Sequence, residues 1–391
     1  MKIIGCDFHH GFQQISMLDV ETKQRVKKKL HHASGAAEQF YRSLQGQRVR
    51  VGIEACGNTR WFERLLQRWG HELVVGDAAR IRAAAVRKQK NDERDADHLL
   101  ELLTTGRFPA IWVPSPEERD LRQLLLHRHK LVQMRTRIKN QLQHVALDQG
   151  LQKKRQLWTE RGRQWLLELS LPPWTERRRS DLLVLLDGLE PAIAELSQAV
   201  EMAAQQDPRV QLLRTHPGVG PITALAFVLV IGDVQRFAHS NQLASYLGLI
   251  PSEDSSAGRR RLGAISKQGN TLLRTLLVEA GQSAARCDPQ LKRAYQRCCH
   301  RKSLTGIGKV MVARKLAVRL YWMLKSNQPY TPARMQGSPS HPVSTREGSS
   351  IVRGQLDRLS GRPASPSDLG VRTWNHDRRA AAVDRIDGWW S

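Results

Sequence analysis

Four acidic residues in the first quarter of the chain have the spacing of a metal-binding group. Asp7 and Glu54 each end a short apolar segment, and Asp92 and Asp95 open a helical stretch. The i, i+3 spacing puts Asp92 and Asp95 on one helix face and turns Asp97 away from it. Converging carboxylates repel each other unless a cation lies between them, and four can hold two Mg²⁺ ions about 4 Å apart. Each acid alone is equally compatible with a strand-end or helix-capping role.

A polar loop far downstream offers a different kind of chemistry. Residues 252–261 contain three serines followed by three consecutive arginines, Arg259, Arg260 and Arg261. A serine is a nucleophile only where a base or a metal ion activates it, so the loop alone is also compatible with simple phosphate binding.

A glycine-rich turn forms the third candidate site. Gly218 and Gly220 precede an apolar segment at residues 222–231, which we expect to be a helix. A turn of this kind aims backbone N–H groups outward and suits a phosphate. A tight turn between two core helices explains the same residues equally well.

The charge of the chain indicates a polyanionic partner. It has 391 residues, with 62 Lys+Arg against 37 Asp+Glu and a formal net charge of +25. Basic side chains displace counterions from phosphates, so a phosphodiester is the expected substrate of the acidic group. The N-terminus does not resemble a signal peptide and no apolar run approaches a membrane span. The five cysteines are scattered without a C-x-x-C pair. We therefore expect no membrane association, no disulfide framework and a cytoplasmic, nucleoid-associated bacterial protein.

The elements that must position these residues follow from the hydrophobic pattern. Short apolar segments alternate with helical ones in a mixed α/β order, and residues 78–105 are expected to be helical. The predicted strands are residues 2–7, 13–19, 26–31, 48–54 and 71–76, and the predicted helices between them are residues 35–45 and 59–69.

A helical arm and a second compact region are expected after this α/β part. Residues 116–150 repeat apolar side chains at three-, four- and seven-residue steps, which predicts a long amphipathic helix. Self-association as a coiled coil and packing on its own domain both remain open. A return helix is expected near residues 181–204. Further helices are predicted at residues 222–231, 271–280 and 310–324. The predicted domains are 1–112, a 113–208 coiled-coil linker, 209–327 with a helix-hairpin-helix-like turn, and a disordered 328–391 tail rich in Ser, Pro, Gly and Arg.

The motifs that contain these residues resemble those of the DEDD insertion-sequence transposases, the family numbered one-ten, whose RNA-guided members are called bridge recombinases. In the N-terminal part the matching motifs are Gly5-Cys6-Asp7, residues 52–57 and residues 90–96. In the C-terminal part they are residues 217–224, 232–237, 247–251 and 265–270.

The resemblance implies a ribonuclease H/RuvC-like N-terminal domain and a mostly helical serine transposase domain. Asp7, Glu54, Asp92 and Asp95 would bind Mg²⁺, or alternatively Mn²⁺. The family's catalytic serine corresponds to Ser256, although Ala257 before Gly258 departs from the pattern and leaves Ser255 as a rival. The candidate nucleic-acid-binding residues are Gly218, Gly220, Arg259, Arg260, Arg261 and Lys267.

The activity implied is DNA strand exchange through a covalent phosphoserine intermediate. The partners implied are donor and target DNA, a noncoding bridge RNA, and further copies of the chain in a dimer or tetramer with an active site shared between subunits. Two alternatives stay open on the sequence: a hydrolytic RuvC-like junction nuclease, and a non-enzymatic nucleic-acid-binding protein.

Overall fold

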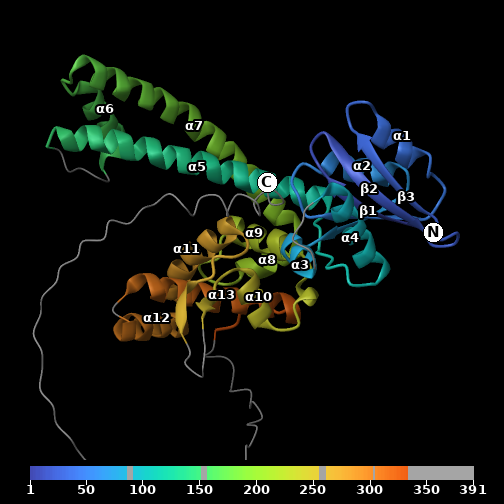
Figure 1. The fold of residues 1–391 in the computed structure, drawn as a ribbon. Coiled ribbons are helices and arrows are strands. Elements are labelled where there is room, and N and C mark those ends of the chain that lie inside the picture. Colours follow the sequence, from blue (N-terminus) through green and yellow to red (C-terminus); the bar gives the residue numbers. More distant parts are fainter. Residues whose placement is uncertain (86–90, 151–155, 255–260, 303, 333–391) are drawn as a thin grey trace, which may run out of the picture.

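The computed structural model of the protein describes residues 1–85, 91–150, 156–254, 261–302 and 304–332 (Figure 1). Three groups of elements follow one another along the chain: a sheet with helices, a long helical hairpin and a compact group of helices. This order agrees with the fold class predicted from the sequence. Nearly all of the tail predicted to be disordered lies outside the described residues.

The N-terminal group is built on a five-stranded mixed sheet in the order β3-β2-β1-β4-β5. β2 runs antiparallel to both of its neighbours, while β1, β4 and β5 are parallel to one another. This arrangement is consistent with the RuvC-like fold that the motifs imply. The strands are β1 (Lys2–Phe8), β2 (Phe12–Asp19), β3 (Arg25–His31), β4 (Val49–Glu54) and β5 (Glu72–Gly76). All five predicted strands are confirmed.

Helices cover both faces of this sheet. Successive side chains of a strand point to opposite faces, so Ile4 and Cys6 are buried on one side, with Tyr41 of α1 and Phe62 of α2. Helix α4 lies on the other face, directly over Gly5 of β1. The helices are α1 (Ala36–Arg42), α2 (Arg60–Arg68), α3 (Ala78–Ala84) and α4 (Asp92–Thr104).

The second group is a helical hairpin that projects from the sheet (Figure 1). Ser115 and Glu118 form a capping box that starts its first helix. Ile138 and Leu142 of this helix form a buried cluster with leucines of the returning helix, where Glu190 pairs with Arg135 at 3.1 Å. The elements are α5 (Pro116–Asp148), η1 (Gln156–Trp158), α6 (Glu160–Glu168) and α7 (Pro173–Gln206). The predicted hairpin is therefore present, and coiled-coil association with another copy stays a prediction.

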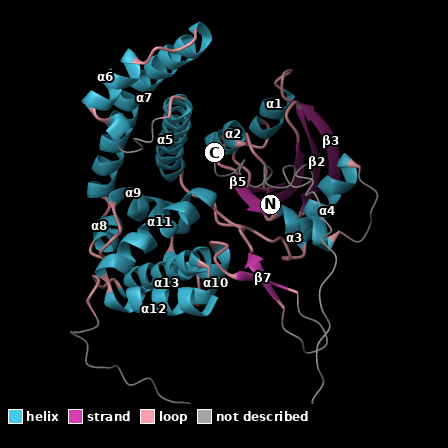
Figure 2. Cartoon of the chain, turned by 90° about the vertical axis from the view of Figure 1, so that its left-hand side faces the viewer, coloured by secondary structure: helices cyan, strands magenta, loops and turns pink. Residues whose placement is uncertain are grey.

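The third group surrounds one helix that is buried on all sides. Every residue of α9 from Thr223 to Ile231 is buried, as expected for a helix that is apolar all round. Figure 2 shows α8, α11 and α13 gathered near it, and α11 and α13 supply much of the same core. The elements are α8 (Pro208–Arg214), α9 (Pro221–Ile231), η2 (Val234–Arg236), α10 (Ser240–Tyr246), β6 (Pro251–Glu253), β7 (Leu262–Ile265), α11 (Thr271–Cys287), α12 (Pro289–Lys302) and α13 (Thr305–Ser326).

Helix α5 connects the sheet to the C-terminal helices through two arginines. Arg119 pairs with Glu63 of α2, and Arg122 donates from Nε to the Leu229 carbonyl of α9 at 3.1 Å. Both arginine side chains are buried, so they fix the base of the hairpin against both groups. Within the described ranges, every helix is too short or too polar to cross a bilayer.

Candidate active site

Two of the predicted acids stand at neighbouring strand ends and point to the same face of the sheet. β1 and β4 are parallel and pair Cys6 with Ile53, so Asp7 and Glu54 are the next two residues in register. Two residues earlier, Gly5 lies beneath α4. Because side chains two apart on a strand share a face, Asp7 and Glu54 project from the face that α4 covers.

The other two acids are brought to this point by the first turn of α4. The side chain of Asn91 caps the helix by accepting from the Glu93 amide at 3.1 Å, and Asp92 and Asp95 follow within the first turn. Negative side chains are favoured here because the helix dipole is positive at its N-terminus.

Asp97 lies on a different side of α4 and has a structural role. It accepts from the buried Ser16 hydroxyl at 2.7 Å and pairs with Lys27 at 2.6 Å, both on the antiparallel strands. These bonds hold α4 on the sheet, which confirms that Asp97 is turned away from Asp92 and Asp95.

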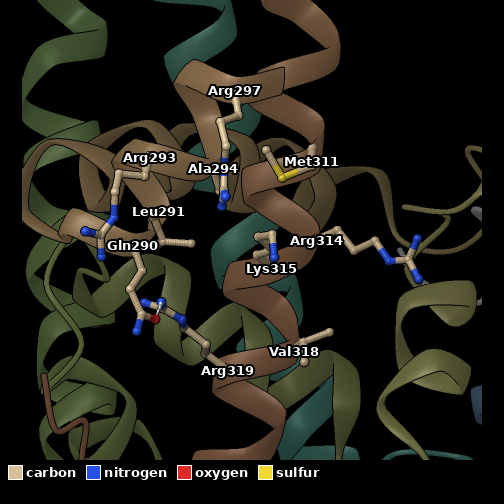
Figure 3. A pocket seen from close by; sticks show the side chains of 10 residues that line it. All are labelled: Gln290, Leu291, Arg293, Ala294, Arg297, Met311, Arg314, Lys315, Val318 and Arg319. Carbon is tan, nitrogen blue, oxygen red and sulfur yellow. Dashed lines mark hydrogen bonds between the residues drawn. The ribbon is translucent and has the colours of Figure 1, made fainter. Parts of the chain in front are cut away.

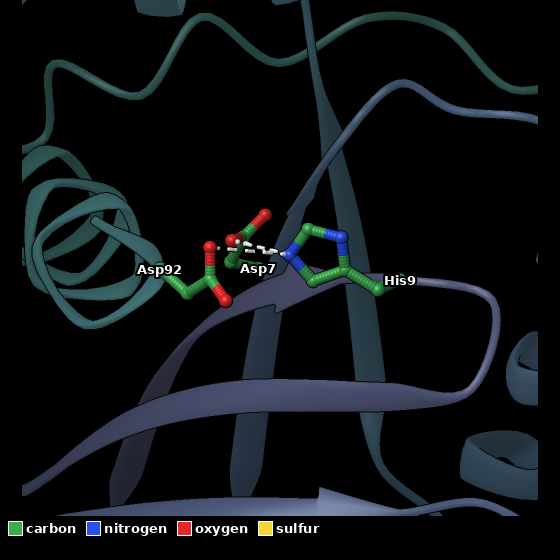
Figure 4. Close-up of side chains that lie close together, drawn as sticks. All are labelled: Asp7, His9 and Asp92. Atoms are coloured by element: carbon green, nitrogen blue, oxygen red, sulfur yellow. Dashed lines mark hydrogen bonds and ion pairs between the residues drawn. The ribbon is translucent and has the colours of Figure 1, made fainter. Parts of the chain in front are cut away.

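Three side chains form the centre of the site (Figure 4). Asp7, His9 and Asp92 each offer one ligand atom, and these atoms all lie within 4.8 Å of one another. His9 Nε2 lies 2.9 Å from a carboxylate oxygen of Asp7 and 3.7 Å from one of Asp92. Asp7 is the least exposed of the three, at 19 %, whereas nearly half of the Asp92 side chain is exposed. The group is thus anchored in the protein on one side and open to solvent on the other.

The electrostatics of Asp7 are those of an acid placed close to other acids. Burial raises the pKa of Asp7, and the nearby carboxylates of Asp95 and Asp92 raise it further, while His9 lowers it. The repulsion shows that Asp95 also acts on Asp7, although it does not belong to the three-residue group. His9 is the neighbour that lowers the pKa of Asp7, so it favours the ionised carboxylate.

Glu54 stands apart from the three-residue group, paired to a cation. Its carboxylate lies 3.3 Å from a guanidinium nitrogen of Arg82, and both side chains are more than one-third exposed. Burial raises the pKa of the nearby Cys56 to about 12, with further contributions from Glu54 and Asp7. Both acids thus act electrostatically on the Cys56 thiol, so Glu54 lies at the edge of the acidic group that contains Asp7.

The serine loop belongs to a short hairpin in the C-terminal group. β6 and β7 pair antiparallel, and the Asp254 amide donates to the Arg261 carbonyl at 3.0 Å. Ser252 donates its hydroxyl to the Ala264 carbonyl at 3.0 Å and so serves the hairpin itself. The predicted residues Ser255, Ser256, Arg259 and Arg260 lie outside the described residues.

The predicted glycine turn is packed on α11. Gly218 has φ of +88°, and a Cβ there would lie 2.4 Å from the Ala284 amide nitrogen, so only glycine fits without strain. Gly220 is exposed and immediately precedes α9. Lys267 also adopts a positive φ, of 55°, two residues before the positive-φ Gly269. Gly218 therefore has a clear packing role, while Gly220 presents an accessible backbone.

Comparisons with known protein families match both the N-terminal and the C-terminal part of the chain. A model of DEDD transposases of the IS110 type, described as "Transposase", matches residues 4–150, and a model described as "Transposase IS116/IS110/IS902 family" matches residues 210–296. Together they match more than half of the chain. The protein belongs to the IS110 family of transposases. The first match contains all four predicted acids, and the second contains the glycine turn, the serine loop and the first half of α12.

Two relatives of this transposase are also named transposases, and a third is named for gene inversion. A "Probable family 20 transposase" of Pseudomonas aeruginosa is 29% identical, with 83% of this chain and 97% of the relative aligned. A "Transposase for insertion sequence element IS1111A" of Coxiella burnetii is 27% identical over 73% of this chain and 78% of its own length. A "Pilin gene-inverting protein" of Moraxella lacunata is 27% identical, covering 71% and 80% respectively.

Two residues of the candidate site were not predicted from the sequence. His9 lies two residues after Asp7, so the strand alternation already puts both on one face, and this was the signal available. Arg82 lies on α3, and nothing in the local sequence connects it to Glu54. Arg82 supplies positive charge to Glu54, and His9 lies within hydrogen-bond distance of Asp7.

Proposed function

We propose that this transposase exchanges DNA strands through a covalent phosphoserine intermediate formed by Ser256, with divalent metal bound by Asp7, Glu54, Asp92 and Asp95. The observation that carries the proposal is the convergence of Asp7 and Asp92, from a strand end and a helix start 85 positions apart, on ligand atoms within 4.8 Å. Metal-dependent phosphoryl transfer uses carboxylates that meet in this way to hold divalent ions.

The residues of this site fit a hard divalent ion. Carboxylate oxygens are the ligands that Mg²⁺ and Mn²⁺ prefer. Burial, with a smaller contribution from the nearby carboxylates, raises the pKa of Asp7, and a bound cation would favour its ionised form. When bound, the metal would stabilise the negative charge that develops on the transferring phosphoryl group. His9 Nε2 contacts Asp7, so His9 either joins the ligand set or leaves Asp7 when a cation arrives.

The chemistry assigned to Ser256 balances without an external energy source. Its hydroxyl oxygen forms a bond to the DNA phosphorus, the bond from phosphorus to one deoxyribose oxygen breaks, and the hydroxyl proton passes to a base. The phosphodiester energy is retained in the serine ester, so the reverse attack by another DNA end rejoins a strand. The name of the Moraxella relative, a gene-inverting protein, is in keeping with cutting that is followed by rejoining.

The partners follow from the same proposal. Sequence choice would be delegated to a bridge RNA that pairs with donor and target DNA, while the basic protein binds backbones. The acids and Ser256 belong to groups of elements separated by the α5–α7 hairpin. We therefore propose a dimer or tetramer in which the acids of one subunit meet the serine of another.

A complementation experiment tests the chemistry and the sharing of the site together. Strand exchange is measured with purified protein, bridge RNA and Mg²⁺, and protein–DNA adducts are trapped by denaturation. Ser256→Ala and Asp92→Ala proteins should each be inactive, and a mixture of the two should regain activity if the site is shared between subunits.

Several outcomes would contradict parts of this proposal. Full activity of Ser256→Ala together with an inactive Ser255→Ala protein would move the nucleophile to Ser255. DNA cleavage without any trapped adduct would favour the hydrolytic junction nuclease. Undetectable binding of Mg²⁺ and Mn²⁺ by calorimetry, with DNA binding intact, would favour the non-enzymatic alternative.

A further inference from the structure

A basic groove between α12 and α13 lies apart from the acidic site. It has a volume of about 770 Å³, and its ten lining residues include four arginines and one lysine but no acid. Figure 3 shows side chains of both helices directed toward the same space, with Leu291 and Ala294 beneath them. These two apolar residues are buried, so the groove has an apolar floor and charged walls.

Three of the cations have no acidic partner among the residues that the structure describes. Arg293 and Arg297 are exposed on α12, one helical turn apart, and Lys315 is exposed on α13 opposite them. Each is absent from every ion pair found within the described ranges. Three like charges that converge without compensation favour binding of an anion.

The fourth cation is held in place by a buried acid. Asp288, which is 3% exposed, pairs with Arg319 at 2.8 Å and also accepts from the Leu291 amide at 2.7 Å. Arg319 Nη2 in addition donates to Gln290 at 2.9 Å. These bonds tie the start of α12 to α13, so the groove is preformed. Arg314 differs from the others, because its guanidinium reaches toward Asn241 of α10, at 3.4 Å.

We propose that this groove binds the phosphodiester backbone of a nucleic acid. A row of cations one turn apart suits a polymer that carries charge at regular intervals, and arginine binds phosphate through a planar fork of donors. None of the lining residues belongs to the acidic tetrad, the glycine turn or the serine loop. The inference rests on the proposed function only in taking nucleic acid as the partner; it does not depend on metal or on Ser256.

The test compares two variants that lose the same charge. The groove variant carries Arg293→Gln, Arg297→Gln and Lys315→Gln. The control carries Arg286→Gln, Lys292→Gln and Lys309→Gln, which removes three cations from α11, α12 and α13 outside the groove lining. Binding to duplex DNA, to structured RNA and to polyglutamate is measured between 50 and 200 mM salt, with EDTA present so that no strand exchange occurs.

The nucleic-acid affinity of the groove variant should depend less on salt than that of the parent protein, whereas the control should keep the parent's salt dependence. Each phosphate contact contributes about 0.9 to the slope of log K against log salt for duplex DNA and about 0.7 for single strands. For duplex DNA, loss of two or three contacts should lower the slope by about 1.8–2.7, which reduces the affinity change over this fourfold salt range by about 10- to 40-fold. A loss confined to DNA or to RNA identifies which backbone occupies the groove.

Three results would overturn the proposal: an unchanged slope in the groove variant, an equal loss in the control, or a loss restricted to polyglutamate, which would indicate an acidic protein partner. A second variant with Arg293→Lys and Arg297→Lys keeps the charge and should keep the slope, which separates lost phosphate contacts from damage to the fold. Because EDTA excludes metal-dependent chemistry, failure of the strand-exchange proposal would leave this result intact.

Discussion

Replacing Gly5 by alanine should damage the acidic site without touching any acid. A Cβ at Gly5 would lie 2.3 Å from the Ala96 carbonyl oxygen and 2.4 Å from the Leu100 amide nitrogen. Both are backbone atoms of α4, so no side-chain rotation relieves the clash. Restoring a contact of 3.4 Å requires α4 to move away from β1 by roughly 1 Å. That movement carries Asp92 and Asp95 away from Asp7.

The expected cost of Gly5→Ala has two parts. Overpacking should lower the free energy of unfolding by about 1–3 kcal/mol, measured by urea denaturation. A displacement of about 1 Å at a reacting centre can lower the rate by about 100-fold, measured as strand exchange, and divalent-ion affinity should fall with it.

Two further glycines provide a graded control. Gly52→Ala would meet only the Leu103 side chain, at 2.6 Å, which can rotate, so its effect should be smaller. Gly11→Ala meets nothing within 4 Å and should behave as the parent protein. If Gly5→Ala matched Gly11→Ala in stability and metal affinity, the close approach of α4 would not be what assembles the site.

The remaining predictions concern buried ionisable groups. Asp7→Asn should raise the stability of the metal-free protein at neutral pH in urea denaturation, because burial raises the pKa of Asp7 and so penalises its ionised form. This gain should disappear as the pH falls through the raised pKa and Asp7 becomes protonated, and calorimetry should show weaker metal binding at every pH. Burial lowers the pKa of His216 from 6.5 to about 4, so the stability that its neutral form contributes should be lost between those pH values, and His216→Gln should flatten that loss. Asp288→Ala should lower the free energy of unfolding, measured by heat or urea, by about 3 kcal/mol because Arg319 loses its acidic partner. The double change with Arg319→Leu should recover part of this loss.

The strands and their terminal acids could be predicted because a short apolar run is a local signal. Asp7 and Glu54 each end such a run, and the structure shows both strands to within one residue. The i, i+3 spacing of Asp92 and Asp95 likewise predicted that they share one face of α4. Convergence itself could only be suspected, since it depends on α4 crossing β1 at Gly5, a contact between residues far apart in sequence.

Other parts of the molecule had no local signal of this kind. Six of the fourteen residues of α12 are Lys, Arg or His, so its apolar face is reduced to a few residues such as Leu291 and Ala294. The β6–β7 hairpin is short, polar and rich in serine, which resembles a loop by composition. The partnership of Glu54 with Arg82 arises from tertiary structure alone.

The acids at the two strand ends already have side-chain partners at the place where a metal ion is proposed to bind. Asp7 contacts the His9 ring, and Glu54 contacts the Arg82 guanidinium, so each acid of the two strand ends already has a nitrogen-bearing partner. Neither contact is well buried, because His9 is 40% exposed and Arg82 is 55% exposed, and exposed ion pairs contribute little free energy. Both can therefore be exchanged at low cost for a divalent ion. The fold can thus keep the acids close together in the absence of metal, since α4 is held by Gly5 packing and by Asp97 rather than by the acids themselves.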